Sequence, residues 1–343
     1  MKNRYYALDV MRSVAIIGVL VIHVTATVLP DAAERTWTEG IVLFLNQAFR
    51  FAVPAFLFLS GLGLSLSDNS KLGYFAFLNK RLSKILLLYV LWSIVYHAVS
   101  YQSFVPLTFL KELVTGGAYY HLYYMPLIIL FYLLYPVLYR IGSTMLGLLG
   151  ALVLSAASQL IATYAGIPLF GNLLNPLNWL VYFVLGIWFA EDFSKKLAII
   201  RNYKPFILPL YFAALFGLFL ETYLTKGIIG VGIATTSIRP SVILYSCLFF
   251  MMLLGAWPEG RQPATFTLRL SKLSYGIYLS HAAVLSAISA VYRELGMPQG
   301  TVVFLVVAFV SVVCLSVLLS LLSYVSIHRT KTWMNKSVSQ SLQ

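Results

Sequence analysis

The stretch ALDVMRSVAIIGVLVIHV, residues Ala7–Val24, has the length and composition of a membrane-spanning helix, yet it carries three titratable side chains. Asp9 and Arg12 stand near its start, and His23 lies deep in its apolar part. A span needs about 20 apolar residues to cross a hydrocarbon core of about 30 Å. Ionisable groups inside a span are costly, so they usually face a cavity or a partner. The stretch therefore predicts a transmembrane helix with a functional group inside the membrane.

The rest of the chain has the same apolar character. Of its 343 residues, 60% are hydrophobic and only 10% are charged, which is more apolar surface than the core of one soluble domain can bury. We therefore expect an all-α integral membrane protein, a polytopic bundle of about ten transmembrane helices. The apolar runs that predict these helices are 8–29, 40–67, 82–100, 121–139, 145–164, 177–190, 206–224, 240–256, 274–292 and 300–327. Pro54 should bend the second run.

The charge pattern predicts the orientation. The net charge of +13 comes from 24 basic and 11 acidic residues, but the basic residues fall in short clusters between apolar runs and form no face for nucleic acid. With the N-terminus inside, 18 of the 24 lie in cytoplasmic segments, which is the usual bias of membrane proteins. We expect both termini in the cytoplasm, one transmembrane domain over residues 1–328 and a short cytoplasmic tail over residues 329–343.

The basic N-terminus also allows a second interpretation. Lys2 and Arg4 ahead of an apolar run are typical of a secretory signal peptide. Against cleavage, Arg12 and His23 interrupt the apolar region and nine more apolar runs follow. We therefore expect the first run to be retained as a helix of the mature protein.

Arg12 and His23 stand eleven positions apart. On an α-helix this spacing returns to within roughly 20° of the same direction and covers about 16.5 Å, so both side chains face one way at different depths. Asp9 is placed to hold Arg12 through an i, i+3 ion pair. The spacing suits a long acyl carrier whose phosphates bind Arg12 and whose reactive end reaches His23. The alternative is that Arg12 is a positive anchor at the cytoplasmic interface and His23 a hydrogen-bonded packing residue.

Five segments carry a resemblance to a known family. The first is LDVMRSVAIIGVLVIH, which resembles the Arg-x10-His motif in the first helix of membrane acyltransferase family 3. The other four resemble later segments of that family, in the same order along the chain. They are FRFAVPAFLFLSG (Phe49–Gly61), NKRLSKILLLY (Asn79–Tyr89), HLYYMPLIILFYLLYP (His121–Pro136) and LSYGIYLSH (Leu273–His281).

The resemblance implies an integral membrane enzyme of about ten helices. Such enzymes move an acyl group, usually acetyl, from cytoplasmic acyl-CoA to a hydroxyl of a surface glycan or its lipid-linked precursor. It implies that His23 is the catalytic histidine, that Arg12 contacts the coenzyme and that Arg50 is a site residue. No esterase-like domain follows the last run, so we expect the stand-alone form.

Each of the other three basic candidates, Arg50, Arg81 and Lys84, has two possible roles. Arg50 either binds the acyl donor and steadies the oxyanion of the transfer reaction, or forms an ion pair with Asp9 or Glu39. Arg81 and Lys84, one turn apart at the entry of the third run, either anchor that run at the interface or bind coenzyme phosphates.

The remaining candidates lie near the other motifs. His121 and Tyr123 stand at the outer end of the fourth run and suit contacts to a sugar, although tyrosines there are also typical of an aromatic belt. Tyr278 and His281 lie one turn apart on the ninth run, and we expect them to support the site rather than to react. Both cysteines lie in apolar runs and build neither a disulfide framework nor a metal motif, so we expect no metal.

The sequence thus predicts a multi-pass O-acetyltransferase of a bacterial plasma membrane. Its expected partners are acyl-CoA (acetyl-CoA first), a glycan or glycolipid acceptor and membrane lipids, and a homo-oligomer is left open. Two alternatives stay open. A transporter or flippase of a lipid-linked sugar would line its path with Arg12, Arg50 and His23, and a non-catalytic scaffold would use them for packing.

Overall fold

The computed structural model describes the backbone of residues 5–67, 73–101 and 104–341, and the side chains as far as residue 324. These residues form an all-α protein without strands, which confirms the predicted fold class. The helices that build the bundle are α1 (Tyr6–Val28), α2 (Trp37–Ala48), α3 (Ala52–Ser65), α4 (Tyr74–Leu82), α5 (Leu86–Tyr101), α6 (Pro106–Thr115), α7 (Tyr124–Gly142), α8 (Met145–Leu160), α10 (Leu180–Ala190), α11 (Phe193–Asn202), α12 (Lys204–Ile229), α14 (Pro240–Ala256), α15 (Thr265–Glu294) and α16 (Val302–Ser341).

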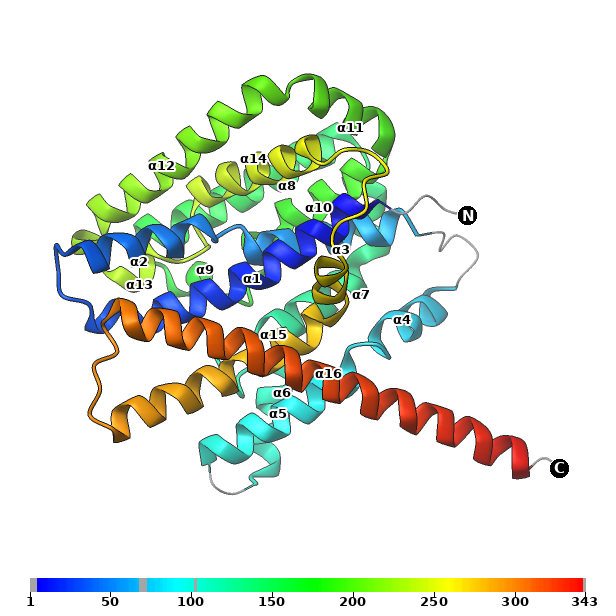
Figure 1. Ribbon diagram of the computed structural model, residues 1–343. Helices are drawn as coiled ribbons and strands as arrows, with labels where there is room; N and C mark the ends of the chain where they lie inside the picture. Colours follow the sequence, from blue (N-terminus) through cyan, green and yellow to red (C-terminus); the bar gives the residue numbers. More distant parts are fainter. Residues whose placement is uncertain (1–4, 68–72, 102–103, 342–343) are drawn as a thin grey trace.

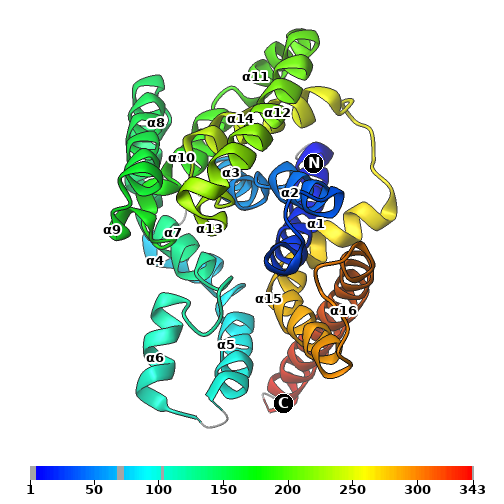
Figure 2. The same cartoon turned by 90° about the vertical axis from the view of Figure 1, so that its left-hand side faces the viewer.

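Short elements connect these helices. They are the 3₁₀ turns Leu29–Asp31 and Pro176–Asn178, the π-helical turn Ile161–Ala165, and the helices α9 (Pro168–Gly171) and α13 (Val231–Ala234). Figure 1 shows α1 inside the bundle, with α15 and α16 running beside it and α12, α14 and α8 stacked on the other side. Figure 2 shows α5 and α6 as a separate arm beside α7.

Each of the ten predicted apolar runs coincides with a helix or a pair of helices. Within the described residues, seven helical segments are long and apolar enough to span a membrane, and one of them consists of α2 and α3 together. The pair α4 and α5, bent by 46°, would be an eighth, and α10 and α14 are shorter apolar helices. The ten runs were therefore placed correctly, but four of them do not form one uninterrupted helix of spanning length.

The second run is interrupted near Pro54, as predicted. Residues 49–51 separate α2 from α3, one turn before the proline. Pro54 has no N–H to donate to the carbonyl of Arg50, and its ring crowds that carbonyl, so an α-helix cannot pass through this turn. The interruption places Arg50 between two helices in the interior of the bundle, where its side chain is 9% exposed.

Glycines set the closest helix crossing. A Cβ atom added at Gly61 of α3 would collide with the carbonyl oxygen of Phe183 on α10, and one added at Gly186 would collide with the carbonyl oxygen of Phe58. Small residues at a crossing let two backbones approach within a membrane. The α3–α10 pair therefore forms a close-packed centre, with α1 packed on α3 and α7 packed on α10, while α15 packs on α1.

The last helix is longer than predicted. The tenth run was expected to end at residue 327 and to be followed by a polar tail, but α16 continues to Ser341 and extends beyond the bundle (Figure 1). The sequence from 302 to 341 contains neither glycine nor proline, so nothing in it ends the helix where the residues become polar.

Candidate active site

The Arg12 end of the predicted site is an ion pair supported by a serine. The Nη1 atom of Arg12 lies 3.6 Å from Oδ1 of Asp9, which confirms the i, i+3 pair. Ser271 of α15 donates to the same Asp9 oxygen at 2.9 Å and accepts a hydrogen bond from Arg12 at 3.3 Å. Ser271 was missed by the sequence analysis, because its contact spans more than 250 residues. It fixes the Arg12 side chain against α15.

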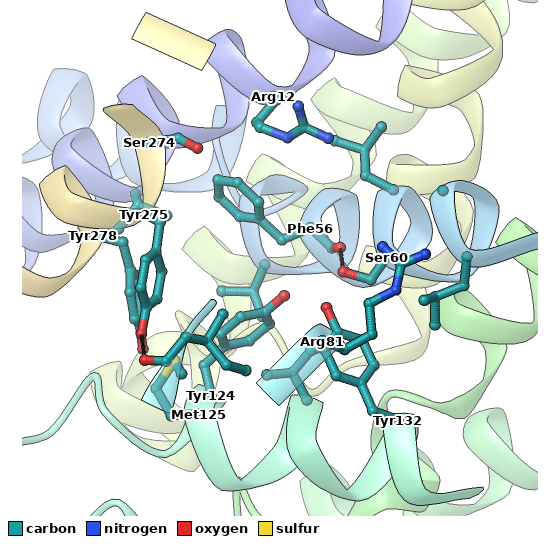
Figure 3. Close-up of a pocket in the computed structure, with 17 residues that line it drawn as sticks. Arg12, Phe56, Ser60, Arg81, Tyr124, Met125, Tyr132, Ser274, Tyr275 and Tyr278 are labelled. Carbon is teal, nitrogen blue, oxygen red and sulfur yellow. Dashed lines mark hydrogen bonds between the residues drawn. The ribbon is translucent and has the colours of Figure 1, made fainter. Parts of the chain in front are cut away.

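Arg12 lines a cavity of about 410 Å³ that lies between α1, α3, α4, α7 and α15. Its polar lining includes Arg12, Arg81, Ser60, Tyr124, Tyr132, Ser274, Tyr275 and Tyr278. Figure 3 shows the Tyr275 and Tyr278 rings side by side at one end of the cavity and Arg81 at the opposite end. The rest of the lining is mostly aliphatic and aromatic, including Val19, Leu59 and Met125. Pockets of about 300–1,000 Å³ with apolar walls and a few polar groups are the usual form of small-molecule sites.

The two basic residues predicted at the entry of the third run do not lie in the same site. Arg81 belongs to α4 and lines the cavity, but Lys84 lies in the turn between α4 and α5, is exposed, and is not part of the cavity lining. The break at residues 83–85 turns α5 away from α4, so the one-turn spacing expected on a continuous helix does not hold. Of this pair, only Arg81 faces the cavity.

His23 belongs to a cluster of three histidines. Its ring centroid lies 5.0 Å from that of His281 on α15, and His281 lies 4.8 Å from His121 in the turn before α7. The ring of Tyr120 packs on His23 at 4.9 Å. His23 follows the cavity residue Val19 by one helical turn, but it is not part of the cavity lining itself. The cluster thus lies just beyond the end of the cavity that Tyr278 closes.

The hydrogen bonding of the cluster is incomplete. His281 is fully buried and its Nδ1 lies 2.7 Å from the carbonyl oxygen of Tyr278, so Nδ1 carries the proton and Nε2 is an acceptor. Within the described chain, neither this Nε2 nor either ring nitrogen of the buried His121 has a hydrogen-bond partner. The hydroxyl of Tyr278 donates to the carbonyl oxygen of His121. Buried polar atoms usually have partners, and exceptions concentrate where a ligand or a reaction supplies them.

Arg50 is anchored next to this cluster by an asparagine. Both Nε and Nη2 of Arg50 donate to Oδ1 of Asn46, the first at 3.1 Å. Asn46 in turn donates to Oγ1 of Thr25 at 2.9 Å and to the carbonyl oxygen of Ile22 at 3.3 Å, on either side of His23. Arg50 is thereby tied to α1 at the level of His23, close enough for an electrostatic interaction between the two side chains.

The alternative ion pairs for Arg50 are wrong. Asp9 pairs with Arg12, and Glu39 pairs with Lys226 and accepts from the backbone N–H of Arg35. Arg50 is held by Asn46 instead. Asn46 was not predicted, and no signal in the sequence distinguishes it from an ordinary polar residue of the second run.

The two candidates for substrate contacts are placed differently from the expectation. His121 is 2% exposed and belongs to the histidine cluster rather than to an outer mouth. Tyr123 is half-buried and packs on Trp179 with ring centroids 6.1 Å apart. The neighbouring Tyr120, one of the tyrosines beside His121, is 49% exposed.

No metal centre is formed by the residues that the structure describes. They contain no group of three or more His, Cys, Asp and Glu side chains that could hold a metal ion.

Comparison with protein families gives one match. A family model described as an acyltransferase domain matches residues 5–321, nearly the whole chain. Comparison with curated proteins and with solved structures gave no match. The matched range contains the cavity, the histidine cluster and every predicted site residue. The chain belongs to membrane acyltransferase family 3.

Proposed function

We propose that this multi-pass membrane acyltransferase moves an acetyl group from cytoplasmic acetyl-CoA to a hydroxyl of a cell-surface glycan or a lipid-linked saccharide. One observation carries the proposal: a cavity lined by Arg12 and Arg81 stops one helical turn short of a histidine cluster in which both ring nitrogens of His121 and Nε2 of His281 have no partner among the described residues. We place the enzyme in a bacterial plasma membrane, with the arginine end of the cavity toward the cytoplasm.

The donor is bound along the cavity. The phosphates of the coenzyme pair with Arg12 and Arg81, because a guanidinium offers a planar fork of donors that matches phosphate oxygens. The apolar lining accepts the pantetheine arm and the acetyl thioester, and the adenine nucleotide stays at the cytoplasmic mouth. In this arrangement Asp9 and Ser271 hold Arg12 in place and do not touch the coenzyme.

The chemistry takes place at His23. Its ring accepts the proton of the acceptor hydroxyl, whose oxygen attacks the thioester carbonyl and forms a tetrahedral oxyanion. The C–S bond then breaks, the acetyl ester is formed, and the CoA thiolate takes the proton from the His23 imidazolium. Arg50, held by Asn46 beside α1, stabilises the negative charge of the oxyanion.

A covalent variant uses the same residues. His23 attacks the thioester first, releases CoA and passes the acetyl group to the hydroxyl in a second step. Mass spectrometry of protein quenched after mixing with acetyl-CoA alone separates the two routes. An acetyl group on His23 supports the covalent route, and unmodified His23 with intact turnover supports direct transfer.

The function is tested with purified protein in lipid nanodiscs, radiolabelled acetyl-CoA and extracts of candidate glycans. The wild type should label one class of glycan, and His23→Ala should lose at least a hundredfold in rate while folding normally, because general-base help contributes roughly 10²- to 10⁴-fold. Transport of unmodified lipid-linked sugar without any acetyl donor would instead support the transporter, and full labelling by folded His23→Ala would contradict the mechanism.

A further inference from the structure

His23 has accessible surface that the donor cavity does not explain. The residue is partly exposed, unlike His121 and His281, and it is not among the residues that line the cavity, which include Tyr278 and Met125. The exposed part of His23 therefore lies outside the donor cavity. A transferase that joins two substrates needs such a second approach, because the acceptor hydroxyl and the thioester must reach the same imidazole from different sides.

The residue at this second approach is Tyr120. Its ring lies 4.9 Å from the ring of His23 with an interplanar angle of 50°, and 49% of its surface is exposed. Tyr120 also packs on Tyr119 at 4.8 Å and on His121 at 5.5 Å. A tyrosine of an ordinary aromatic belt would face lipid head groups from the perimeter. Tyr120 instead packs on the histidine cluster and stays partly exposed.

Two ring neighbours of Tyr120, namely Tyr119 and His23, are hydrogen-bonded to side-chain hydroxyl groups. Tyr119 and Ser286 are hydrogen-bonded to each other through their hydroxyls, and both are half-buried. Thr27 lies one turn beyond His23 on α1, and its hydroxyl donates to the carbonyl oxygen of His23 at 3.0 Å. These three side chains and Tyr120 carry no formal charge. An aromatic face beside several neutral hydroxyls matches a neutral sugar ring, whose C–H face is apolar and whose rim is a set of hydroxyls.

We propose that Tyr120 is the platform on which a neutral pyranose ring of the acceptor stacks, so that one of its hydroxyls points at His23. The proposal rests on the proposed function and deepens it, because it assigns the acceptor side of the same site. Tyr119, Ser286 and Thr27 supply hydrogen bonds to the other hydroxyls of the ring. Donor and acceptor thus meet at His23 from opposite sides of the cluster.

The test compares two simple acceptors, hexyl β-glucoside and 1-hexanol, with radiolabelled acetyl-CoA and protein in nanodiscs. Tyr120→Ala should raise the KM for the glucoside about two- to tenfold, since a stacked ring pair contributes about 0.5–1.5 kcal/mol. The KM for acetyl-CoA and the KM for hexanol should stay at their wild-type values. Tyr120→Phe keeps the ring and should restore the wild-type KM for the glucoside.

Tyr101→Ala is the matched control. Tyr101 is 47% exposed, and its ring packs on another histidine, His97, at 4.8 Å, so the substitution removes an equally exposed tyrosine from a comparable contact. It should leave the KM for the glucoside unchanged.

Three results would overturn the assignment. They are a wild-type KM for the glucoside in Tyr120→Ala, an equal rise for glucoside and hexanol, which would indicate a general apolar contact, and the same rise in Tyr101→Ala. Failure of the proposed function looks different. In that case the wild-type protein forms no labelled ester with the glucoside or any glycan, and the assignment falls with it.

Discussion

Two buried histidine sites of this protein are built in opposite ways. In the arm of α5 and α6, His97 is fully buried and both of its ring nitrogens have partners. Its Nδ1 lies 2.7 Å from the Glu112 carboxylate, and its Nε2 accepts from the backbone N–H of Val105 at 3.1 Å. In the cluster around His23, His121 is as deeply buried, yet neither of its ring nitrogens has a partner within the described residues.

The difference separates stability from function. A satisfied buried imidazole stabilises the local structure, and removing it leaves its partners without hydrogen bonds. An unsatisfied one weakens the fold and is retained where a ligand or a reacting group completes its hydrogen bonds. His97 therefore joins α5 to α6, whereas the cluster of His23, His121 and His281 is where the proposed function places the reacting substrates.

The largest expected effect on stability is at the satisfied site. His97→Phe leaves the buried Glu112 without its imidazole partner and should lower the free energy of unfolding by about 3 kcal/mol. Thermal unfolding in detergent, followed by tryptophan fluorescence, measures the change. Acetyl transfer per folded molecule should be unaffected, because α5 and α6 place His97 outside the cavity and the cluster. An unchanged unfolding temperature would show that the pair contributes nothing to the fold.

The same substitution in the cluster should have the reverse outcome. His121→Phe removes two nitrogens that have no partner, so the unfolding free energy should stay within about 1 kcal/mol of the wild type. The kcat for acetyl transfer should fall about tenfold or more, because the ring can no longer bond to the reacting groups. The comparison fails if His121→Phe loses stability as His97→Phe does while keeping its kcat.

The smallest expected effects are on the KM for acetyl-CoA, and they distinguish Arg81 from Lys84. Arg81→Ala removes a guanidinium from the cavity and should raise the KM for acetyl-CoA about tenfold, since hydrogen bonds to charged groups contribute about 1.5–3 kcal/mol. Lys84→Ala removes an exposed cation outside the cavity and should change the same KM less than about twofold. Steady-state kinetics over a range of acetyl-CoA concentrations gives both values. Equal effects of the two substitutions would mean that surface charge, not the cavity, binds the donor.

The sequence predicted what depends on local pattern. Apolar runs placed the helices, Pro54 placed the break before α3, and the eleven-residue spacing placed Arg12 and His23 on one stripe of α1. These follow from helix geometry and backbone chemistry alone. The Asp9–Arg12 pair is of the same kind, because both residues lie within one turn.

The sequence could not predict what depends on packing between distant helices. His121 was expected at an outer mouth, but the turn before α7 enters the bundle and brings it against His281, 160 positions later. Ser271 and Asn46 were identified only through their contacts with Arg12 and Arg50, and only the structure shows that Tyr120 packs on His23. The bend between α4 and α5 separated Arg81 from Lys84, because a continuous helix had been assumed there.

The most direct test of the account is the rate of acetyl transfer per folded molecule in His23→Ala and His97→Ala, measured side by side with radiolabelled acetyl-CoA and one glycan acceptor. The account predicts that His97→Ala is less stable but transfers at the wild-type rate, and that His23→Ala folds normally and loses at least about a hundredfold in rate. Wild-type transfer by His23→Ala, or an equal loss in both variants, would contradict it.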